Sequence, residues 1–310
     1  MPITIITGGS GLIGRSLTNY LISLGHDIII FTRKSLNSDR LQVTYKLWDP
    51  EKGTLDIESI QKADYIINLA GAGVMDKPWT PEYKKLILNS RVASGKVLSQ
   101  ALDKTTHGVK AFIAASAIGW YGEDKTDLKH TYGFIESDPP AKGFLGETCL
   151  LWEESVNSIE KTNTRLVKLR FGIVLSNEGG AFPEFKNSLK FGVASILGNG
   201  KQIISWIHID DLCRMIVFAM QDDTVTGIYN AVSPEPVRNK EMIIHTAKTL
   251  RHRFYVPVHV PKMAIQLMLG ERSTEILKSA TVNCKKIKTA GFTFLYPSLK
   301  LALDELCKNA

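Results

Sequence analysis

The sequence predicts an α/β fold built on a doubly wound parallel sheet, and three observations support this prediction. Apolar runs typical of strands alternate with longer segments of helical spacing over residues 1–175. The strand candidates are apolar along their whole length, as in a sheet that helices cover on both faces. A glycine-rich turn, TGGSGLIG, follows the first of them. Strands that alternate with helices pair in parallel through right-handed crossovers.

The expected elements follow one another in a regular order. The strands are expected at residues 3–6, 27–31, 64–69, 111–115 and 166–175. The helices between them are expected at 12–24, 84–102 and 147–158, and the first should close at Gly25. A continuous α/β unit over this length is typical of a single nucleotide-binding domain.

After Leu175 the pattern changes, which predicts a second lobe that interleaves with the first. The stretch SNEGGAFPEF reads as loop, and a helix is expected around 185–191. The segment 206–233 returns to strand and helix character. Beyond Pro234 we expect two or three helices and a strand at RFYVPV. Residues 1–175 with 206–233 therefore form the predicted first domain, and 176–205 with 234–310 form a smaller, mostly helical substrate lobe.

Composition narrows the class of protein. The chain has 310 residues, 44% of them hydrophobic, which is ample for a large core. No apolar run approaches the roughly 20 residues that cross a bilayer. Because residue 3 already reads as strand, no signal peptide is expected. The four cysteines lie far apart without a CxxC or Cys/His cluster, so we expect no zinc or other metal site, no disulfide frame and a reduced, cytoplasmic compartment.

The formal net charge of +7 raises the question of an anionic partner. The basic residues are scattered, with only short clusters such as Lys285, Lys286 and Lys288, and no basic tail is visible. This pattern favours a solvated basic surface over a nucleic-acid footprint. A basic protein that binds an anionic small molecule is also consistent with it.

The turn TGGSGLIG has the pattern and setting of a phosphate-binding loop. Gly8, Gly11 and Gly14 recur between a predicted strand and a predicted helix. The first glycine of such a motif permits a tight turn, the second lets the backbone approach a pyrophosphate, and the third lets helix pack closely on strand. The helix N-terminus offers free N–H groups and a partial positive charge. The loop therefore predicts dinucleotide binding on a Rossmann-type sheet.

The end of the second strand indicates which dinucleotide is bound. An NAD site places a carboxylate there to accept from the ribose 2′-hydroxyl. Here IIIFTRK ends in Thr32, Arg33 and Lys34, without a carboxylate. A guanidinium and an ammonium beside a hydroxyl suit a 2′-phosphate. The sequence therefore predicts NADP(H) rather than NAD(H). The alternative interpretation of these residues is a solvated basic turn with no role in binding.

Several further motifs are shared with one known family. With the glycine loop, the stretches NLAG from Asn68, SAIGWYG from Ser116 and WIHIDDL from Trp206 resemble the extended short-chain dehydrogenases/reductases. The stretch LRFGIVL, the stretch GGAF and the tail AGFTFLYPSLKLAL resemble an atypical subgroup, the epimerase family proteins, whose tail forms their own C-terminal domain. The resemblance covers the whole chain.

The resemblance implies a set of cofactor contacts. The pyrophosphate contacts would be Gly8, Gly11, Leu12, Ile13 and Gly14, the 2′-phosphate contacts Thr32 and Arg33, and the adenosine side Leu69, Ala70 and Gly71. Arg91 would face the cofactor from the long helix, or it is an ordinary surface arginine.

The acid–base pair of the wider superfamily is missing. Its active members use a Ser or Thr and then Tyr-x-x-x-Lys, in which the lysine lowers the tyrosine pKa. In this chain the tyrosine position falls on Phe144 and the lysine position on Thr148. The Ser/Thr position falls on Ala117, and a shift of one residue would restore Ser116.

Other side chains could supply the acid. Glu147 lies beside the missing lysine, and Tyr121 follows a strand near the cofactor, so we name Glu147, Tyr121 and Ser116 as the catalytic candidates. For His208 a structural role between the lobes is favoured. Asp210 and Asp211 resemble a helix N-cap pair. Arg170 could meet an anionic substrate or be a buried ion-pair partner.

Two functions of different classes remain open. The first is an NADP(H)-dependent oxidoreductase or epimerase-like enzyme, acting on a small polar substrate in a cleft lined by GGAF and GNGKQIISWIH. The second is a protein that binds NADPH without turnover, as a redox sensor or scaffold. We expect a small-molecule partner, no nucleic acid and no membrane. The helix expected over 84–102 could pair with its symmetry mate and give a homodimer.

Overall fold

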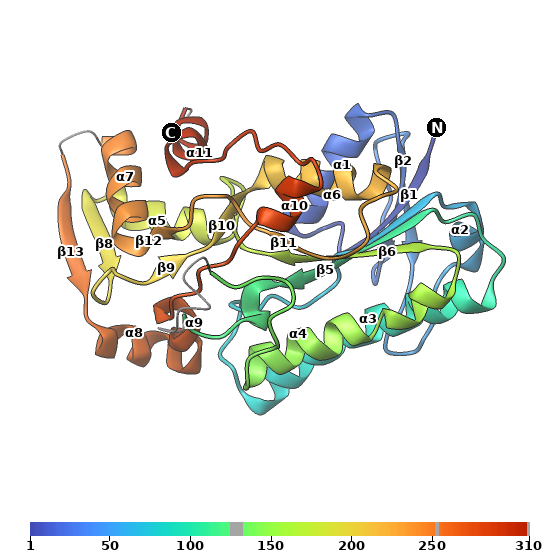
Figure 1. Ribbon diagram of the computed structural model, residues 1–310, viewed down its shortest axis with the longest axis horizontal. Helices are drawn as coiled ribbons and strands as arrows, with labels where there is room; N and C mark the ends of the chain where they lie inside the picture. Colours follow the sequence, from blue (N-terminus) through green and yellow to red (C-terminus); the bar gives the residue numbers. More distant parts are fainter. Residues whose placement is uncertain (125–132, 252–253, 309–310) are drawn as a thin grey trace.

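A sheet of seven strands forms the centre of the molecule, whose computed structural model describes residues 1–124, 133–251 and 254–308. The strand order is β3-β2-β1-β4-β5-β6-β11 (Figure 1). The strands are β1 (Ile3–Thr7), β2 (Asp27–Thr32), β3 (Val43–Leu47), β4 (Tyr65–Asn68), β5 (Ala111–Ala117), β6 (Arg165–Phe171) and β11 (Gly227–Ala231). Every neighbouring pair is parallel. The predicted doubly wound parallel sheet is confirmed.

Helices cover both faces of this sheet (Figure 1). On one face α1 (Leu12–Ser23) packs against α6 (Ile209–Gln221). On the other face α3 (Pro81–Lys104) and α4 (Phe144–Glu154) run side by side, near α2 (Ile57–Lys62) and the short η3 (Asn157–Lys161). Because side chains alternate along a strand, Ile6 contributes to the core under α1 and Ile5 to the core under α3.

The direction of winding reverses between β1 and β4. From β1 the chain proceeds through β2 to β3, and from β4 it proceeds the other way through β5 to β6. The last residue of β1, Thr7, pairs with Phe31 on one side and Asn68 on the other. Open α/β sheets bind ligands beyond the carboxyl ends of their strands at such a switch point. The glycine loop begins there.

The second lobe combines small sheets with short helices. Its two-stranded sheets pair β8 (Val193–Leu197) with β13 (Val256–Val260) and β9 (Ile203–Ile204) with β12 (Val237–Arg238). A further pair, β7 (Ile173–Leu175) with β10 (Trp206–His208), lies in the segments expected for the first domain. Its helices are α5 (Ala181–Leu189), α7 (Asn239–Arg251), α8 (Lys262–Leu269), α9 (Ser273–Leu277), α10 (Lys285–Thr289) and α11 (Leu299–Leu306), with η4 (Gly270–Arg272) after α8. The strand β11 returns to the main sheet beside β6.

Three expectations about the chain after residue 165 were wrong. The strand expected over 166–175 is broken at Gly172, because Phe171 pairs with Ala231 of the main sheet whereas Ile173 pairs with Trp206 of β10. The stretch expected to be loop contains the start of α5, which begins directly after Gly180 (φ +77°). Beyond Pro234 the described residues hold more helices than the two or three expected.

Smaller differences concern element ends. The helix expected over 147–158 runs from Phe144 to Glu154 and is followed by η3. Neither β3 nor α2 was expected, because both are short and only half apolar. The strand expected at RFYVPV corresponds in part to β13, while Arg253 lies outside the described residues. The first helix ends as expected, with Gly25 in the left-handed region (φ +81°).

Candidate functional site

The glycine loop leaves no room for side chains. Gly8 has φ +66°, and a Cβ there would lie 2.7 Å from the carbonyl oxygen of Leu69. A Cβ on Gly14 would lie 2.4 Å from the Gly8 carbonyl oxygen and 2.6 Å from Gly9 Cα. These distances are shorter than van der Waals contact. The first glycine therefore makes the turn, and the third lets α1 pack against the loop.

The N-terminus of α1 presents unoccupied donors toward the switch point. Its N-cap is Gly11, and no side chain caps the helix. The Gly11 N–H donates to the Gly8 carbonyl at 3.0 Å, while Leu12, Ile13 and Gly14 of the first turn have no earlier helical carbonyl to bond. Free N–H groups and the helix dipole together stabilise an anion at this end. The loop thus has the shape and polarity of a pyrophosphate cradle.

A threonine hydroxyl holds the opposite wall of the cradle. Thr7 Oγ1 donates to Asn68 Oδ1 at 2.7 Å and accepts from the N–H groups of Leu69 and Ala70 at 3.1 and 3.2 Å. The Thr7 side chain is fully buried. It therefore fixes the backbone after β4 against the end of β1, which places Leu69, Ala70 and Gly71 beside the glycine loop.

The end of β2 carries positive charge without an acidic partner. Thr32 is half-buried, and its hydroxyl accepts from the Lys34 N–H at 3.3 Å. Arg33 is exposed, and among the described residues no carboxylate lies within ion-pair distance of it. A phosphate would find a hydroxyl, a guanidinium and an ammonium here. These residues fit a 2′-phosphate better than a ribose 2′-hydroxyl.

Arg91 is not an ordinary surface arginine. It is half-buried, its Nη1 donates to the carbonyls of Ala72 and Ile87 at 2.9 and 3.0 Å, and its guanidinium lies 4.9 Å from the Trp152 ring. Burial lowers its pKa. A Cβ on Gly71 would lie 3.0 Å from its Cζ. Arg91 therefore packs against the loop after β4, on the side where the resemblance places the cofactor.

Two of the three acid–base candidates lie inside a buried polar network. Ser116 Oγ donates to Glu153 Oε1 at 2.7 Å, and Glu153 forms a two-pronged ion pair with Arg170 at 2.8 and 3.0 Å. The Tyr121 hydroxyl donates to Asn230 Oδ1 at 2.7 Å and accepts from Arg170 Nη1 at 2.9 Å. We call these five residues the Glu153–Arg170 network.

The network keeps Ser116 and Tyr121 from solvent. Both side chains are essentially fully buried, and Tyr121 stacks on Phe134 with ring centroids 5.1 Å apart. Burial raises the pKa of Tyr121 to about 12, although Arg170 opposes the shift. An acid for hydride-transfer chemistry needs the opposite shift. Of the two roles considered for Arg170, the structure shows the buried ion-pair partner. Its guanidinium carbon lies 3.7 Å from the centroid of the Trp120 ring.

Glu147, named as a candidate acid, does not lie in a buried environment. It is exposed near the start of α4, and its Oε1 accepts from the Gly143 N–H at 3.3 Å. The structure brings Ser116 and Tyr121 into one network and leaves Glu147 outside it, facing solvent.

The cradle, its uncapped helix and the basic end of β2 agree with what comparison of the whole chain finds. A model of the NAD dependent epimerase/dehydratase family matches residues 4–231, and a domain of unknown function (DUF1731) matches residues 260–306. The chain belongs to the NAD dependent epimerase/dehydratase family. Its two matched segments correspond to an atypical extended short-chain dehydrogenase/reductase with its own C-terminal domain.

Curated and solved relatives agree with this assignment. Epimerase family protein SSP1921 of Staphylococcus saprophyticus is 37% identical over 304 residues, covering 97% of this chain and 98% of that protein. The human epimerase family protein SDR39U1, solved with NADPH, has a TM-score of 0.86 at 25% identity, covering 99% and 100% of the two chains. A nucleoside-diphosphate sugar epimerase of Corynebacterium glutamicum has a TM-score of 0.77 at 28% identity, covering 99% of this chain and 58% of that one.

The positions where the resemblance places the Tyr–Lys pair hold a half-buried phenylalanine, Phe144, and a buried threonine, Thr148. Phe144 meets Trp79 edge to face with centroids 5.0 Å apart, and the Lys84 ammonium lies 5.4 Å from the Phe144 ring. Thr148 is buried on the same helix. Neither residue can exchange a proton as a Tyr–Lys pair does.

The stretch WIHIDDL contains His208, for which the sequence favoured a structural role between the lobes. His208 caps α6 by accepting the Asp210 N–H at 3.2 Å, and its other ring nitrogen lies 3.1 Å from Glu305 on α11. The expected Asp210–Asp211 cap was wrong, because His208 takes that position. Asp211 instead accepts the N–H groups of Leu295 and Tyr296, both at 2.8 Å, and so fixes the tail.

Two residues that organise the candidate site, Thr7 and Glu153, were not expected from the sequence. Many strands end in threonine, so the sequence does not indicate that the Thr7 hydroxyl binds the backbone of the loop after β4. Glu153 had a signal. It lies on the buried face of α4 with Cys149 and Trp152, where a carboxylate costs free energy unless a cation pairs with it.

Among residues 1–124, 133–251 and 254–308, no group of three or more His, Cys, Asp or Glu side chains could hold a metal ion. The four cysteines are free, and burial raises the pKa of Cys149 to about 12. A thiolate at neutral pH is therefore strongly disfavoured there.

Proposed function

We propose that the protein binds NADP(H) and acts as an oxidoreductase or epimerase on a small polar substrate held between its lobes. The observation that carries this proposal is the combination of the cradle at α1 with the carboxylate-free, basic end of β2. Support comes from the human relative, which was solved with NADPH. The family description itself names NAD, so the choice of NADP(H) rests on Thr32 and Arg33.

In this proposal the chain's own residues bind and orient the cofactor. Gly8, Gly11 and Gly14 admit the pyrophosphate to the N–H groups of the first turn of α1. Arg33 and Thr32 hold the 2′-phosphate, and Arg91 lies beside the loop after β4. The bound nicotinamide supplies or accepts a hydride. No Tyr–Lys pair is present to move the accompanying proton, so the exposed carboxyl of Glu147 is the candidate donor.

Replacement of Arg33 tests the cofactor assignment. For R33A we expect NADPH affinity to fall by roughly tenfold to a hundredfold, because one charge-assisted contact is lost. NADH affinity should stay unchanged, since NADH carries no 2′-phosphate. Titration by fluorescence or calorimetry measures both constants. R238A removes an exposed arginine on β12 and serves as the control. An unaltered NADPH-to-NADH ratio in R33A would contradict the assignment.

A second candidate function is favoured by a specific observation. Phe144 and Thr148 occupy the positions of the acid–base pair, and the Tyr121 hydroxyl is already committed to Arg170 and Asn230. A protein built in this way could bind NADPH without turnover and report redox state to a partner, or act as a scaffold.

Glu147→Gln and Tyr121→Phe, made separately, distinguish the two functions. If Glu147 is the acid, E147Q lowers turnover of bound NADPH against a panel of carbonyl compounds and leaves NADPH binding intact. Y121F should lower the melting temperature instead, because Arg170 Nη1 and Asn230 Oδ1 each lose a buried hydrogen bond to the Tyr121 hydroxyl, at a cost of about 1–3 kcal/mol. If NADPH stays reduced against the whole panel in the unaltered protein, the sensor or scaffold takes precedence.

A further inference from the structure

The far end of the second lobe exposes an unusual amount of apolar surface. Eight large apolar side chains in the described part of the chain are more than 60% exposed, and six of them lie on three neighbouring segments of this lobe. We call these six the apolar end: Phe191, Phe254, Val256, Met263, Leu267 and Met268. Their exposed fractions run from 62% for Val256 to 89% for Leu267. Exposed apolar clusters of this kind mark interaction surfaces.

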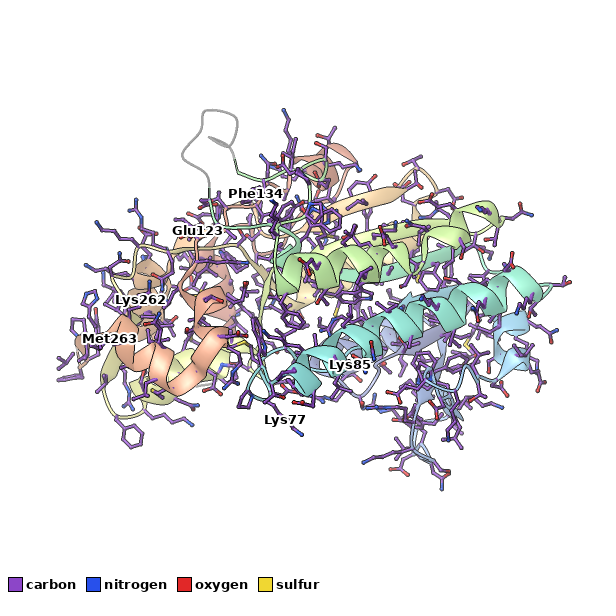
Figure 2. The ribbon with its side chains drawn as sticks, turned by 90° about the horizontal axis from the view of Figure 1, so that it is seen from below. Lys77, Lys85, Glu123, Phe134, Lys262 and Met263 are labelled. Atoms are coloured by element: carbon purple, nitrogen blue, oxygen red, sulfur yellow. The ribbon has the colours of Figure 1, made fainter. Side chains whose placement is uncertain are left out.

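The helix α8 carries three of the six side chains of the apolar end and buries very little of its own surface. Within α8 only Ile265 is buried, and the helix packs mainly on η4 and α9. Met263 and Leu267 stand one turn apart on its outer side. Figure 2 shows Lys262 and Met263 at the left end of the molecule. An eight-residue helix with one buried side chain gains little from folding onto this lobe alone.

The adjoining strand is exposed on the same lobe. In the β8–β13 pair, Ala194 and Ile196 are buried, while Val256 and Val258 lie on the other face, because they pair with Val193 and Ser195. Val256 donates to the Gly192 carbonyl at 2.8 Å, so its N–H points toward β8. The nitrogen of the next residue, Pro257, therefore faces the free edge and has no hydrogen to donate. This strand edge resists pairing with another strand.

Basic side chains border the apolar end. Lys190 precedes Phe191, and Lys262 precedes Met263. Both lysines are exposed and have no carboxylate within ion-pair distance in the described chain. Arg251 lies beside Lys190, because it donates to the Lys190 carbonyl. The nearest acids of η4 and α9 are already paired, Glu271 with Lys84 and Glu275 with Lys278.

Charge and shape together favour one occupant. A second copy would bring the same basic border against itself, and Pro257 removes the option of a shared sheet. Side chains exposed by three quarters or more protrude, so they insert into a soft surface rather than line a groove. Apolar side chains that insert among headgroups, beside lysines that attract anionic lipids, are typical of peripheral membrane contacts.

We propose that the apolar end docks on the surface of an anionic lipid bilayer. Met263, Leu267 and Met268 enter the headgroup region, and Lys262 and Lys190 contact lipid phosphates. The earlier expectation of no membrane partner rested on the lack of a long apolar run, which a surface contact does not need. None of the helices in the described part of the chain combines the length and apolarity that crossing a bilayer demands. This inference is independent of the proposed enzyme activity.

Co-sedimentation of the full chain with lipid vesicles tests the proposal. We expect binding to phosphatidylcholine vesicles that contain phosphatidylserine, weaker binding to phosphatidylcholine alone, and release at high salt. In M263S/L267S the partition coefficient should fall by at least about tenfold, because two inserted side chains are lost. K262E should weaken binding to the anionic vesicles only. L41S removes a fully exposed leucine elsewhere on the molecule and is the matched control.

Each outcome bears on the proposal. Thermal melting of M263S/L267S should match that of the unaltered protein, because both side chains are exposed. Failure of the unaltered protein to sediment with anionic vesicles overturns the proposal, as does an equal loss in L41S. If light scattering shows a dimer that M263S/L267S dissociates, and no vesicle binding occurs, the apolar end is a protein interface and the proposal is wrong.

Discussion

At the scale of single residues, Gly14 shows how little space the phosphate cradle leaves. We expect G14A to destabilise the protein by about 1–3 kcal/mol, because its Cβ would meet backbone atoms of Gly8 and Gly9 that cannot yield. The melting temperature should fall by roughly 2–4 °C per kcal/mol, and NADPH binding should weaken with it. Calorimetry of the free protein and a cofactor titration measure the two effects.

Gly108 provides a matched control for that substitution. A Cβ at Gly108 would meet nothing within 4 Å. G108A should therefore leave the melting temperature within about 2 °C of the original value. An equal loss in G14A and G108A would show that close packing at the cradle is not what the third glycine provides.

The local structure of individual residues was predictable where the backbone conformation alone decides it. The close packing at Gly8 and Gly14 follows from the glycine pattern, because a Cβ at either position would meet backbone atoms. The roles of Thr32 and Arg33 stay predictions. Ser116 and Tyr121 could not be placed from the sequence. Their surroundings depend on Glu153 and Arg170, which come from a helix and a strand that meet only in the folded protein.

At the scale of elements, α4 is joined to the sheet by polar as well as apolar contacts. Glu153 of α4 pairs with Arg170 of β6, and both side chains are almost fully buried. A buried pair that loses one charge leaves the other uncompensated, at a cost of about 3–5 kcal/mol. We expect E153Q to destabilise the protein by that order and to lower the denaturant midpoint. E58Q breaks an exposed pair with Lys62 and should have no measurable effect.

Helices and strands were predictable where the hydrophobic pattern of one type of element continues over its whole length. The strands β1, β2, β4 and β5 and the helices α1 and α3 were expected within a few residues, since continuous apolar runs and helical stripes are long there. The break between β6 and β7 was not, because Gly172 is read as part of an apolar strand until Ser205 is seen beside it. Short, half-exposed elements such as β3 and α2 carry too few apolar residues to be recognised.

At the scale of the whole molecule, the buried hydroxyl of Ser205 connects the segment 280–282 to the rest of the protein through hydrogen bonds. Ser205 Oγ donates to the Ala280 carbonyl at 2.7 Å and accepts from the Val282 N–H at 2.9 Å. The Phe134 N–H donates to the Thr281 carbonyl at 2.7 Å, on the opposite side of the same segment. By contrast, the pair between Lys84 and Glu271 also links the two lobes but is partly exposed, with 63% of the Glu271 side chain accessible.

These two links predict opposite results for two substitutions. S205A leaves a buried carbonyl and a buried N–H unpaired, at about 1–3 kcal/mol each, so the segment 280–282 should open more often. We expect hydrogen exchange at Val282 to accelerate by at least about tenfold and the melting temperature to fall. K84A should change hydrogen exchange at Val282 far less than S205A, because a partly exposed ion pair contributes about 0–1 kcal/mol and Lys84 does not contact the segment 280–282. If K84A opened this segment as much as S205A, the lobes would be held together by surface charge rather than by the buried bonds of Ser205.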